Sequence, residues 1–347
     1  MAAPDRVAAG DEAGTAPGAR SVQTAATASA PDPATRRTQR LRRMNATGGG
    51  RSLPLLTVPA LALYLFWTVV PIVFVFVFAF FDYRGILDFV ASDSIVDVDR
   101  FSGLENFRLV FADEVFVQAL VNTAIQVGVA VPLMIPLAFM LGYYLDRRPV
   151  GWRVLSVFFF TPGLISISIK GTIFYAMLSP NGGLNGILDA VGLGDGGAVD
   201  LTTAWYANPM TALGVIIFVD LWQGIGWTGV LFAARLSAVP VELYEAAAVD
   251  GASEWRRMWG VAYGVIKGYF GTMVMLQFLW TLFNSAPIVY ILTGGGPGTA
   301  TTTLSFLVYQ KAFQQQQIGY SQVVGIVLFL VGVLGLVAIR RAFRQAY

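Results

Sequence analysis

Long apolar runs separated by shorter polar stretches form the pattern of this chain from about residue 53 onward. The hydrocarbon core of a bilayer is about 30 Å thick, so a helix that crosses it needs roughly 20 predominantly apolar residues. Six runs satisfy this requirement: 53–81, 115–145, 154–178, 209–234, 269–293 and 318–339. The pattern predicts an all-α integral membrane protein with six transmembrane helices.

The composition supports this interpretation. Of the 347 residues, 56% are hydrophobic and only 13% are charged, whereas an ordinary soluble domain has about 25% charged residues. So few charged side chains could not cover this much apolar surface in water. A water-soluble globular fold is therefore excluded.

The charges in the loops predict the orientation of the chain. Two loops, 82–114 and 179–208, are acidic, and their carboxylates are Asp82, Asp88, Asp93, Asp97, Asp99, Glu105, Asp113, Glu114, Asp189, Asp195 and Asp200. The loop 82–114 holds only three Arg against its eight acids, whereas the loops on the other side carry Arg147, Arg148, Arg153, Arg235, Arg256, Arg257, Lys267, Arg340, Arg341 and Arg344. Because cytoplasmic loops carry an excess of Lys and Arg, both termini are expected in the cytoplasm.

The first 50 residues differ from the rest. They are rich in Ala, Thr, Gly, Pro and Ser and have few large apolar side chains, so they cannot offset the entropy of ordering. We expect residues 1–50 to be a disordered cytoplasmic tail and residues 51–347 to be the membrane domain. A cleaved secretory signal is disfavoured because the apolar run after the tail is too long.

The chain has no His and no Cys. Their absence excludes His-based catalytic triads, HExxH zinc sites, disulfides and thiol nucleophiles. The glycine-rich segment 293–299, TGGGPGT, lacks the Lys that a P-loop needs for nucleotide phosphates. An external turn is favoured over a phosphate site there, and no metal or cofactor is expected in this chain.

Polar residues inside the fourth run form one candidate site. Asp220, Gln223, Gly224 and Trp227 follow the spacing i, i+3, i+4, i+7, which places them on one face of a helix. A carboxylate, an amide, a gap and an indole on one stripe suit a polyol solute in a transport pathway. The alternative is that these groups bond to neighbouring helices.

Polar residues in two other runs leave the same alternatives open. Gln277, Asn284 and Ser285 in the fifth run could line the pathway or hold neighbouring helices. Lys170 in the third run is expected to reach toward the external interface or to contact another helix, with pairing to Asp220 as a further alternative.

The cytoplasmic loop at about 237–268 has a pattern of its own. Pro240 suits the first turn of a helix and Gly251 suits its end, and the residues between them leave a small, partly apolar face. The following segment, with Trp255, Met258 and Trp259 beside two Arg residues, is typical of an interfacial helix. From the residues alone, docking into a partner and lying on the membrane are both open.

A resemblance favours docking. The segment 245–253, EAAAVDGAS, resembles the EAA loop of permease subunits in binding-protein-dependent ABC importers, about 100 residues before the C-terminus in both. Other segments resemble the sugar-type permeases of the maltose and glycerol-phosphate group, and these are GLENF at 103–107, Asn122–Thr123, GGLN at 182–185, TGGGP at 293–297, Tyr309 to Phe313, and Gly319–Tyr320. The resemblance covers about residues 53–345. Where the family has two prolines after the motif, this chain has Gly264 and Gly268, so a less rigid bend into the fifth helix is expected.

The resemblance implies a coupling helix that sits in a cleft of a cytoplasmic ATPase subunit. The motif residues in this role are Glu245, Ala246, Ala247, Asp250 and Gly251. The resemblance also implies a second related permease, two ATPase subunits that bind ATP and Mg²⁺, an extracytoplasmic solute-binding protein and a location in a bacterial-type plasma membrane. No nucleic-acid partner is expected.

The function expected is therefore a non-catalytic permease subunit of an ATP-driven importer for a sugar or a related polyol-like solute. The alternative is an ion-coupled secondary transporter or channel for a small polar solute, which would need an internal repeat and broken helices that coordinate ions. A membrane-embedded enzyme has little support, because paired intramembrane carboxylates are lacking as well as His and Cys.

Overall fold

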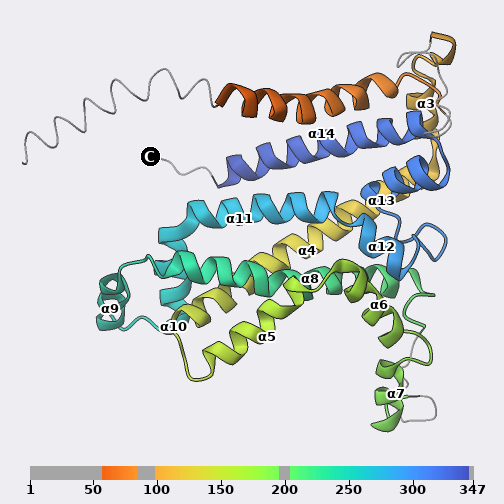
Figure 1. Cartoon of the computed structure of the whole chain (residues 1–347). Helices are drawn as coiled ribbons and strands as arrows, with labels where there is room; N and C mark the ends of the chain where they lie inside the picture. The colour runs from red at the N-terminus through yellow and green to blue at the C-terminus, as the bar shows by residue number, and fades with distance from the viewer. Residues whose placement is uncertain (1–56, 84–97, 195–203, 344–347) are drawn as a thin grey trace, which may run out of the picture. The chain divides into compact units, whose positions relative to one another are not determined.

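The computed structural model describes residues 57–83, 98–194 and 204–343 (Figure 1). The tail expected at 1–50 and parts of both acidic loops lie outside these residues. The chain divides into two compact units, Met1–Trp67 and Thr68–Tyr347. In the first unit the described residues belong to the helix Thr57–Phe78, and the contacts, cavities and sites described below belong to the second unit.

Helices account for most of the described residues. Their bounds are the unlabelled helix Thr57–Phe78, η1 Val98–Arg100, α3 Glu105–Ala112, α4 Glu114–Asp146, α5 Trp152–Leu164, α6 Ile167–Met177, α7 Gly183–Ala190, α8 Pro209–Leu236, α9 Val241–Val249, α10 Glu254–Arg256, the π-helical segment η2 Arg257–Ala262, α11 Tyr263–Phe283, α12 Ala286–Leu292, α13 Leu304–Tyr309, the π-helical segment η3 Gln310–Gln314, and α14 Ile318–Ala342. The β pairing in this part of the chain is an isolated antiparallel bridge between Phe81 and Phe101.

Five helices are long and apolar enough to cross a membrane: Thr57–Phe78, α4, α8, α14, and the continuous helix Glu254–Phe283 that joins α10, η2 and α11. A sixth crossing is obtained if α5 and α6 together count as one span, although the two are bent by 100°. The all-helical architecture is therefore as predicted, whereas the third run is a broken pair and not one straight helix.

The break between α5 and α6 has a local cause. Pro162 and Gly163 weaken the last turn of α5, and Ile165 adopts an extended conformation with φ −71° and ψ 137°. The Ser166 side chain then accepts a hydrogen bond from the backbone N–H of Ile169 and caps the start of α6. The extended Ile165 therefore ends α5, and the capped turn at Ser166 begins α6 as a separate helix.

The fifth span also differs from the predicted range 269–293. The helix begins earlier, at Glu254, and ends at Phe283, whereas 286–292 forms the separate helix α12. Pro287 in the first turn of α12 cannot continue a preceding helix, because its ring removes an N–H donor and clashes with the turn before it. Gly264, one of the two glycines where the family has proline, lies inside the continuous helix.

Glycines bring the central helices into close contact. A Cβ atom added to Gly142 of α4 would lie 2.6 Å from the Cβ of Phe232 and 2.7 Å from the carbonyl oxygen of Gly229, both on α8. A Cβ added to Gly226 of α8 would lie 1.6 Å from the carbonyl oxygen of Phe159 on α5. Small residues permit this approach of helix backbones in membranes, and they make α8 the central helix between α4 and α5.

Candidate functional site

A buried polar network lies between α8 and α11. Asp220 of α8 is only 6% exposed. Its Oδ2 atom accepts a hydrogen bond from the Thr281 hydroxyl at 3.0 Å, and its Oδ1 atom accepts one from Gln223 Nε2 at 3.2 Å. Gln277 Nε2 donates to the Thr281 hydroxyl at 3.0 Å. The carboxylate is therefore held by partners from two helices.

Lys170 of α6 joins this network. Its side chain is 5% exposed, and its ammonium donates a hydrogen bond to Gln223 Oε1. The Gln223 amide therefore links Lys170 to Asp220, accepting from one and donating to the other. The expectation that Lys170 reaches the external interface is wrong, and the interhelical contact holds instead, because the bend after α5 redirects α6.

A cavity of about 290 Å³ lies beside the network. Its lining residues are Gly163, Lys170, Gln223, Gly224, Trp227, Thr228, Gln277 and Trp280. The Trp227 ring stacks on Phe160 of α5 with centroids 5.4 Å apart. The cavity thus offers amides, one ammonium and two indoles, and both indoles are also partly exposed at the surface.

The predicted site residues fall into two groups. Gln223, Gly224 and Trp227 line the cavity together with Gln277, and Asp220 lies behind Gln223. Asn284 and Ser285 are absent from the residues that line it. The Ser285 hydroxyl instead shares a hydrogen bond with the Thr303 hydroxyl at 2.9 Å. This bond joins the residues between α11 and α12 to the start of α13.

The sequence interpretation missed Thr281 and Trp280. Both follow Gln277 at helical spacing, i+4 and i+3, which was the available signal. The role of Lys170 depends on the break between α5 and α6, which hydropathy does not report.

The loop with the motif forms the helix α9 between Pro240 and Gly251, as predicted. Gly251 has φ +76°, a left-handed conformation that favours glycine. Glu245, Ala246 and Asp250 are exposed, and Ala247 is half-buried. The motif residues therefore lie on a surface that a partner can reach.

Tyr244 is the buried residue of α9, at 4% exposure. Burial raises the pKa of Tyr244 to about 12, so its hydroxyl stays protonated at neutral pH. Its ring contacts Tyr143 of α4, with centroids 6.2 Å apart. Tyr244 thus anchors the exposed helix to the bundle.

The segment after Gly251 does not form a separate interfacial helix. Met258 is 5% exposed and the Trp259 ring packs on Phe139 of α4 with centroids 5.1 Å apart, whereas Trp255 is exposed. These residues are the first turns of the long helix Glu254–Phe283. Aromatic packing against α4 draws the segment into the bundle.

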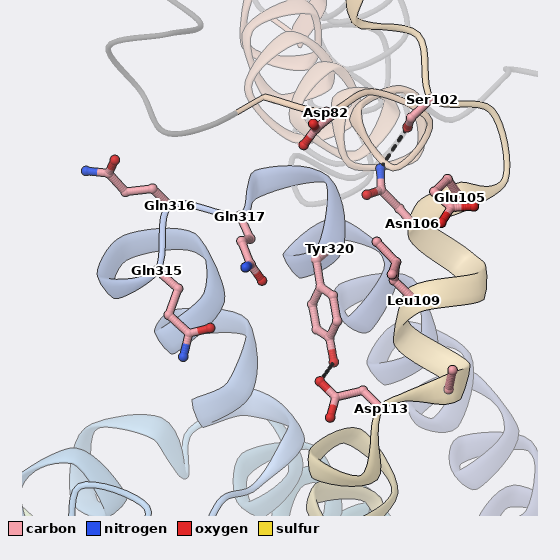
Figure 2. Close-up of a pocket in the computed structure, with 11 residues that line it drawn as sticks. Asp82, Ser102, Glu105, Asn106, Leu109, Asp113, Gln315, Gln316, Gln317 and Tyr320 are labelled. Atoms are coloured by element: carbon pink, nitrogen blue, oxygen red, sulfur yellow. Dashed lines mark hydrogen bonds between the residues drawn. The ribbon is translucent and has the colours of Figure 1, made fainter.

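A second cavity, of about 790 Å³, lies where α3 and the start of α14 meet (Figure 2). Its lining is polar, with Asp82, Ser102, Glu105, Asn106, Leu109, Ala112, Asp113, Gln315, Gln316, Gln317 and Tyr320. Figure 2 shows the Tyr320 hydroxyl pointing at Asp113, to which it donates at 2.7 Å. In Figure 1 this region lies at the opposite end of the bundle from α9.

Asp113 has several partners in this cavity. Burial acts to raise its pKa, but hydrogen bonds from Tyr320 and the Val115 N–H, with the nearby Lys311 ammonium, more than offset burial and hold the pKa of the carboxyl below its ordinary value. The Lys311 Nζ atom lies 3.6 Å from Asp113 Oδ2 and 4.3 Å from the Tyr320 ring centroid. Asp113 thus caps α4 and holds α14 beside it.

Taken together, apolar helices, a cavity lined by amides, an ammonium and indoles, and an exposed loop helix indicate a membrane permease of the transport type. The chain belongs to the family described as binding-protein-dependent transport system inner membrane component, which matches residues 110–347. The family resemblance found in the sequence is confirmed.

Individual proteins agree with this assignment. The chain is 33% identical over 238 residues to the probable ABC transporter permease protein YurN of Bacillus subtilis (strain 168), covering 67% of this chain and 78% of that protein. It is 32% identical over 243 residues to the diacetylchitobiose uptake system permease protein NgcF of Streptomyces coelicolor, covering 66% and 67%. The fold resembles a crystallised bacterial ABC transporter involved in the import of alginate, with a TM-score of 0.70 and 19% identity over 89% of this chain and 98% of that one.

Proposed function

We propose that this chain is the transmembrane subunit of an ATP-driven importer that carries a sugar or a related polyol-like solute. The observation that carries the proposal is the cavity beside Asp220, which Gln223, Gln277 and two indoles line. Sugar hydroxyls suit amide and carboxylate partners, and the C–H faces of a sugar ring suit indoles. The uptake of diacetylchitobiose named for NgcF supports the same solute class.

The charges at the cavity favour an uncharged solute. Lys170 and Asp220 have opposite charges and are joined through one amide, that of Gln223. Their charges balance within the network, so an anionic or cationic solute would find no uncompensated counter-charge. A buried charge without a partner is strongly unfavourable, which explains why the pair is held together.

The proposed assembly has three kinds of protein partner. Cytoplasmic ATPase subunits dock on α9 and hydrolyse ATP with Mg²⁺, a second related permease completes the pathway, and an extracytoplasmic binding protein delivers the solute. The proposed orientation places both termini and α9 in the cytoplasm of a bacterial-type cell. Its support is the basic residues at the α9 end, among them Arg147, Arg235 and Arg257, against acidic residues at the α3 end.

The test is the substitution Asp220→Asn in the assembled importer. The amide leaves the Lys170 charge uncompensated, so uptake of a radiolabelled neutral sugar panel (glucose, maltose and N,N′-diacetylchitobiose) should fall at least about tenfold. The exposed Glu114→Gln is the matched control and should transport normally. The double variant Asp220→Asn/Lys170→Gln removes both charges and should recover part of the uptake.

Two outcomes would contradict the proposal. Unchanged uptake and unchanged ATP hydrolysis in Asp220→Asn would remove this residue from the pathway. Uptake that survives ATP depletion but stops when an ion gradient collapses would instead support the ion-coupled transporter.

A further inference from the structure

The helix α9 contacts the last turn of α4 through stacked side chains. The guanidinium carbon of Arg147, the residue that caps α4, lies 4.1 Å from the ring centroid of Tyr244 and 4.8 Å from that of Tyr143. The two tyrosine rings meet at an interplanar angle of 65°. A planar guanidinium over an aromatic face is an attractive contact, so a displacement of α9 acts on the end of α4.

A chain of hydrogen bonds continues from α4 to the long helix. Arg147 Nη2 donates to the Tyr143 hydroxyl at 2.8 Å, and that hydroxyl donates to Glu254 Oε2 at 2.8 Å. The other carboxylate oxygen of Glu254 lies 2.9 Å from Arg257 Nη2. Hydrogen bonds to ionised groups are stronger than neutral ones. The hydroxyl of Tyr143 therefore joins α4 to the first turn of Glu254–Phe283.

Both helices that meet at Tyr143 extend toward the solute cavity. The long helix Glu254–Phe283 carries Gln277 and Thr281 of the polar network. The other helix, α4, packs against α8, where Asp220 lies, through the close contact of Gly142 with Gly229. Helices transmit a displacement of one end to the other when their packing is tight.

The packing around α9 leaves polar groups unsatisfied. The buried atoms Tyr244 Oη, Arg257 Nε and Trp259 Nε1 have no hydrogen-bond partner within the described residues. All three are donors, and a buried donor without an acceptor is unfavourable. The adjoining η2 is π-helical, a conformation that frequently marks functional sites. Acceptors for these donors would have to come from outside the described residues or from a different local arrangement.

We propose that Tyr143, Arg147, Tyr244 and Glu254 form a coupling latch that makes α4 and the long helix move together when the partner ATPase displaces α9. Tyr143 is the positioning residue, because its hydroxyl accepts from Arg147 and donates to Glu254. This inference rests on the proposed importer function and adds the route from the docking helix to the cavity.

The principal experiment is Tyr143→Phe in the complete importer, reconstituted in proteoliposomes with its ATPase, partner permease and binding protein. The substitution keeps the ring and removes the bridging hydroxyl. Sugar uptake per ATP hydrolysed should fall about tenfold, since a hydrogen bond to a carboxylate is lost, while the amount of assembled complex stays constant. Tyr144→Phe, the same change at an exposed neighbour, should behave as wild type.

Two further variants separate coupling from mere support of the fold. Glu254→Ala should uncouple transport as Tyr143→Phe does, and the double variant should be no worse than either single one, because both break the same link. Tyr244→Ala should also uncouple, and Tyr244→Phe should restore coupling because the ring carries the contact.

The outcomes distinguish this inference from the proposed function. Wild-type uptake per ATP in Tyr143→Phe, or a reduced amount of complex with normal uptake per ATP, would overturn the latch and leave the importer function standing. Absence of ATP-dependent uptake of every sugar in the panel by the wild-type complex would overturn the proposed function itself.

Discussion

The central helices and α9 are held by different kinds of contact: close backbone packing in the first region and a few side-chain contacts in the second. At α4, α5 and α8, glycines leave no space for even one additional carbon atom, as at Gly142 and Gly226. At α9, the ring of Tyr244 contacts the ring of Tyr143 and the guanidinium of Arg147. Three of the four buried side-chain polar atoms without a partner in the described residues lie in α9 or in the first turns of the helix that follows it. The first region has little room for rearrangement, whereas the second has unpaired donors that a rearrangement could satisfy.

The largest expected effect tests the first region. Gly226→Val places side-chain carbons on the backbone of α5, since the first added atom would meet the Phe159 carbonyl oxygen at 1.6 Å. Overpacking of a core costs about 1–3 kcal/mol or more, and here the obstacle is backbone. Thermal unfolding of the detergent-solubilised protein should show severe loss of folded material. The control is Gly214→Val on the same helix, where an added Cβ meets open space, and equal behaviour of the two would refute the contact.

A smaller effect on the fold, with a large effect on transport, is expected at the end of α9. Gly251 has φ +76°, and a side chain in the left-handed region costs roughly 1–2 kcal/mol. Gly251→Val should abolish ATP-driven uptake while the protein remains inserted in the membrane, which membrane fractionation beside the uptake assay would check. Gly264→Val, inside the long helix with open space around its Cβ, is the control. Normal uptake by Gly251→Val would count against docking through α9.

The smallest effect concerns the cap of α4 at the other end. The folded pKa of Asp113 is below its ordinary value, so the ionised form stabilises the fold. This contribution is complete above the unfolded pKa of about 3.9 and is lost as the pH falls below it. The melting temperature of the wild type should drop on acidification below about pH 4 more than that of Asp113→Asn, which retains a capping side chain. Parallel curves for the two proteins would contradict this role.

The prolines show what the sequence could and could not predict about the fold. Hydropathy located the spanning segments because burial in lipid depends on composition over some 20 residues. It could not tell that α4 continues through Pro132 and Pro136 whereas the third run breaks after Pro162. The same residue type has both outcomes, because neighbouring groups decide whether the freed backbone is satisfied.

The candidate site shows the same division. Helical spacing alone placed Gln223, Gly224 and Trp227 on the face that lines the cavity. Lys170 contacts that face because the chain bends between α5 and α6. Ser285 contacts Thr303 because the loop between α12 and α13 folds back, and no local sequence pattern predicts that fold. Helical periodicity therefore predicted which residues of one helix share a face. It could not predict their hydrogen-bond partners on other helices, because those depend on the tertiary fold.

The bend after α5 has a consequence for the lipid around the protein. The 13 residues of α5 rise only ~20 Å, whereas the acyl-chain layer is ~30 Å deep. Its exposed Val154, Val157 and Phe158 therefore belong to an apolar helix that is too short to cross this layer by itself. The remaining depth has to be covered by α6 after its 100° bend, by a locally thinner bilayer or by another polypeptide.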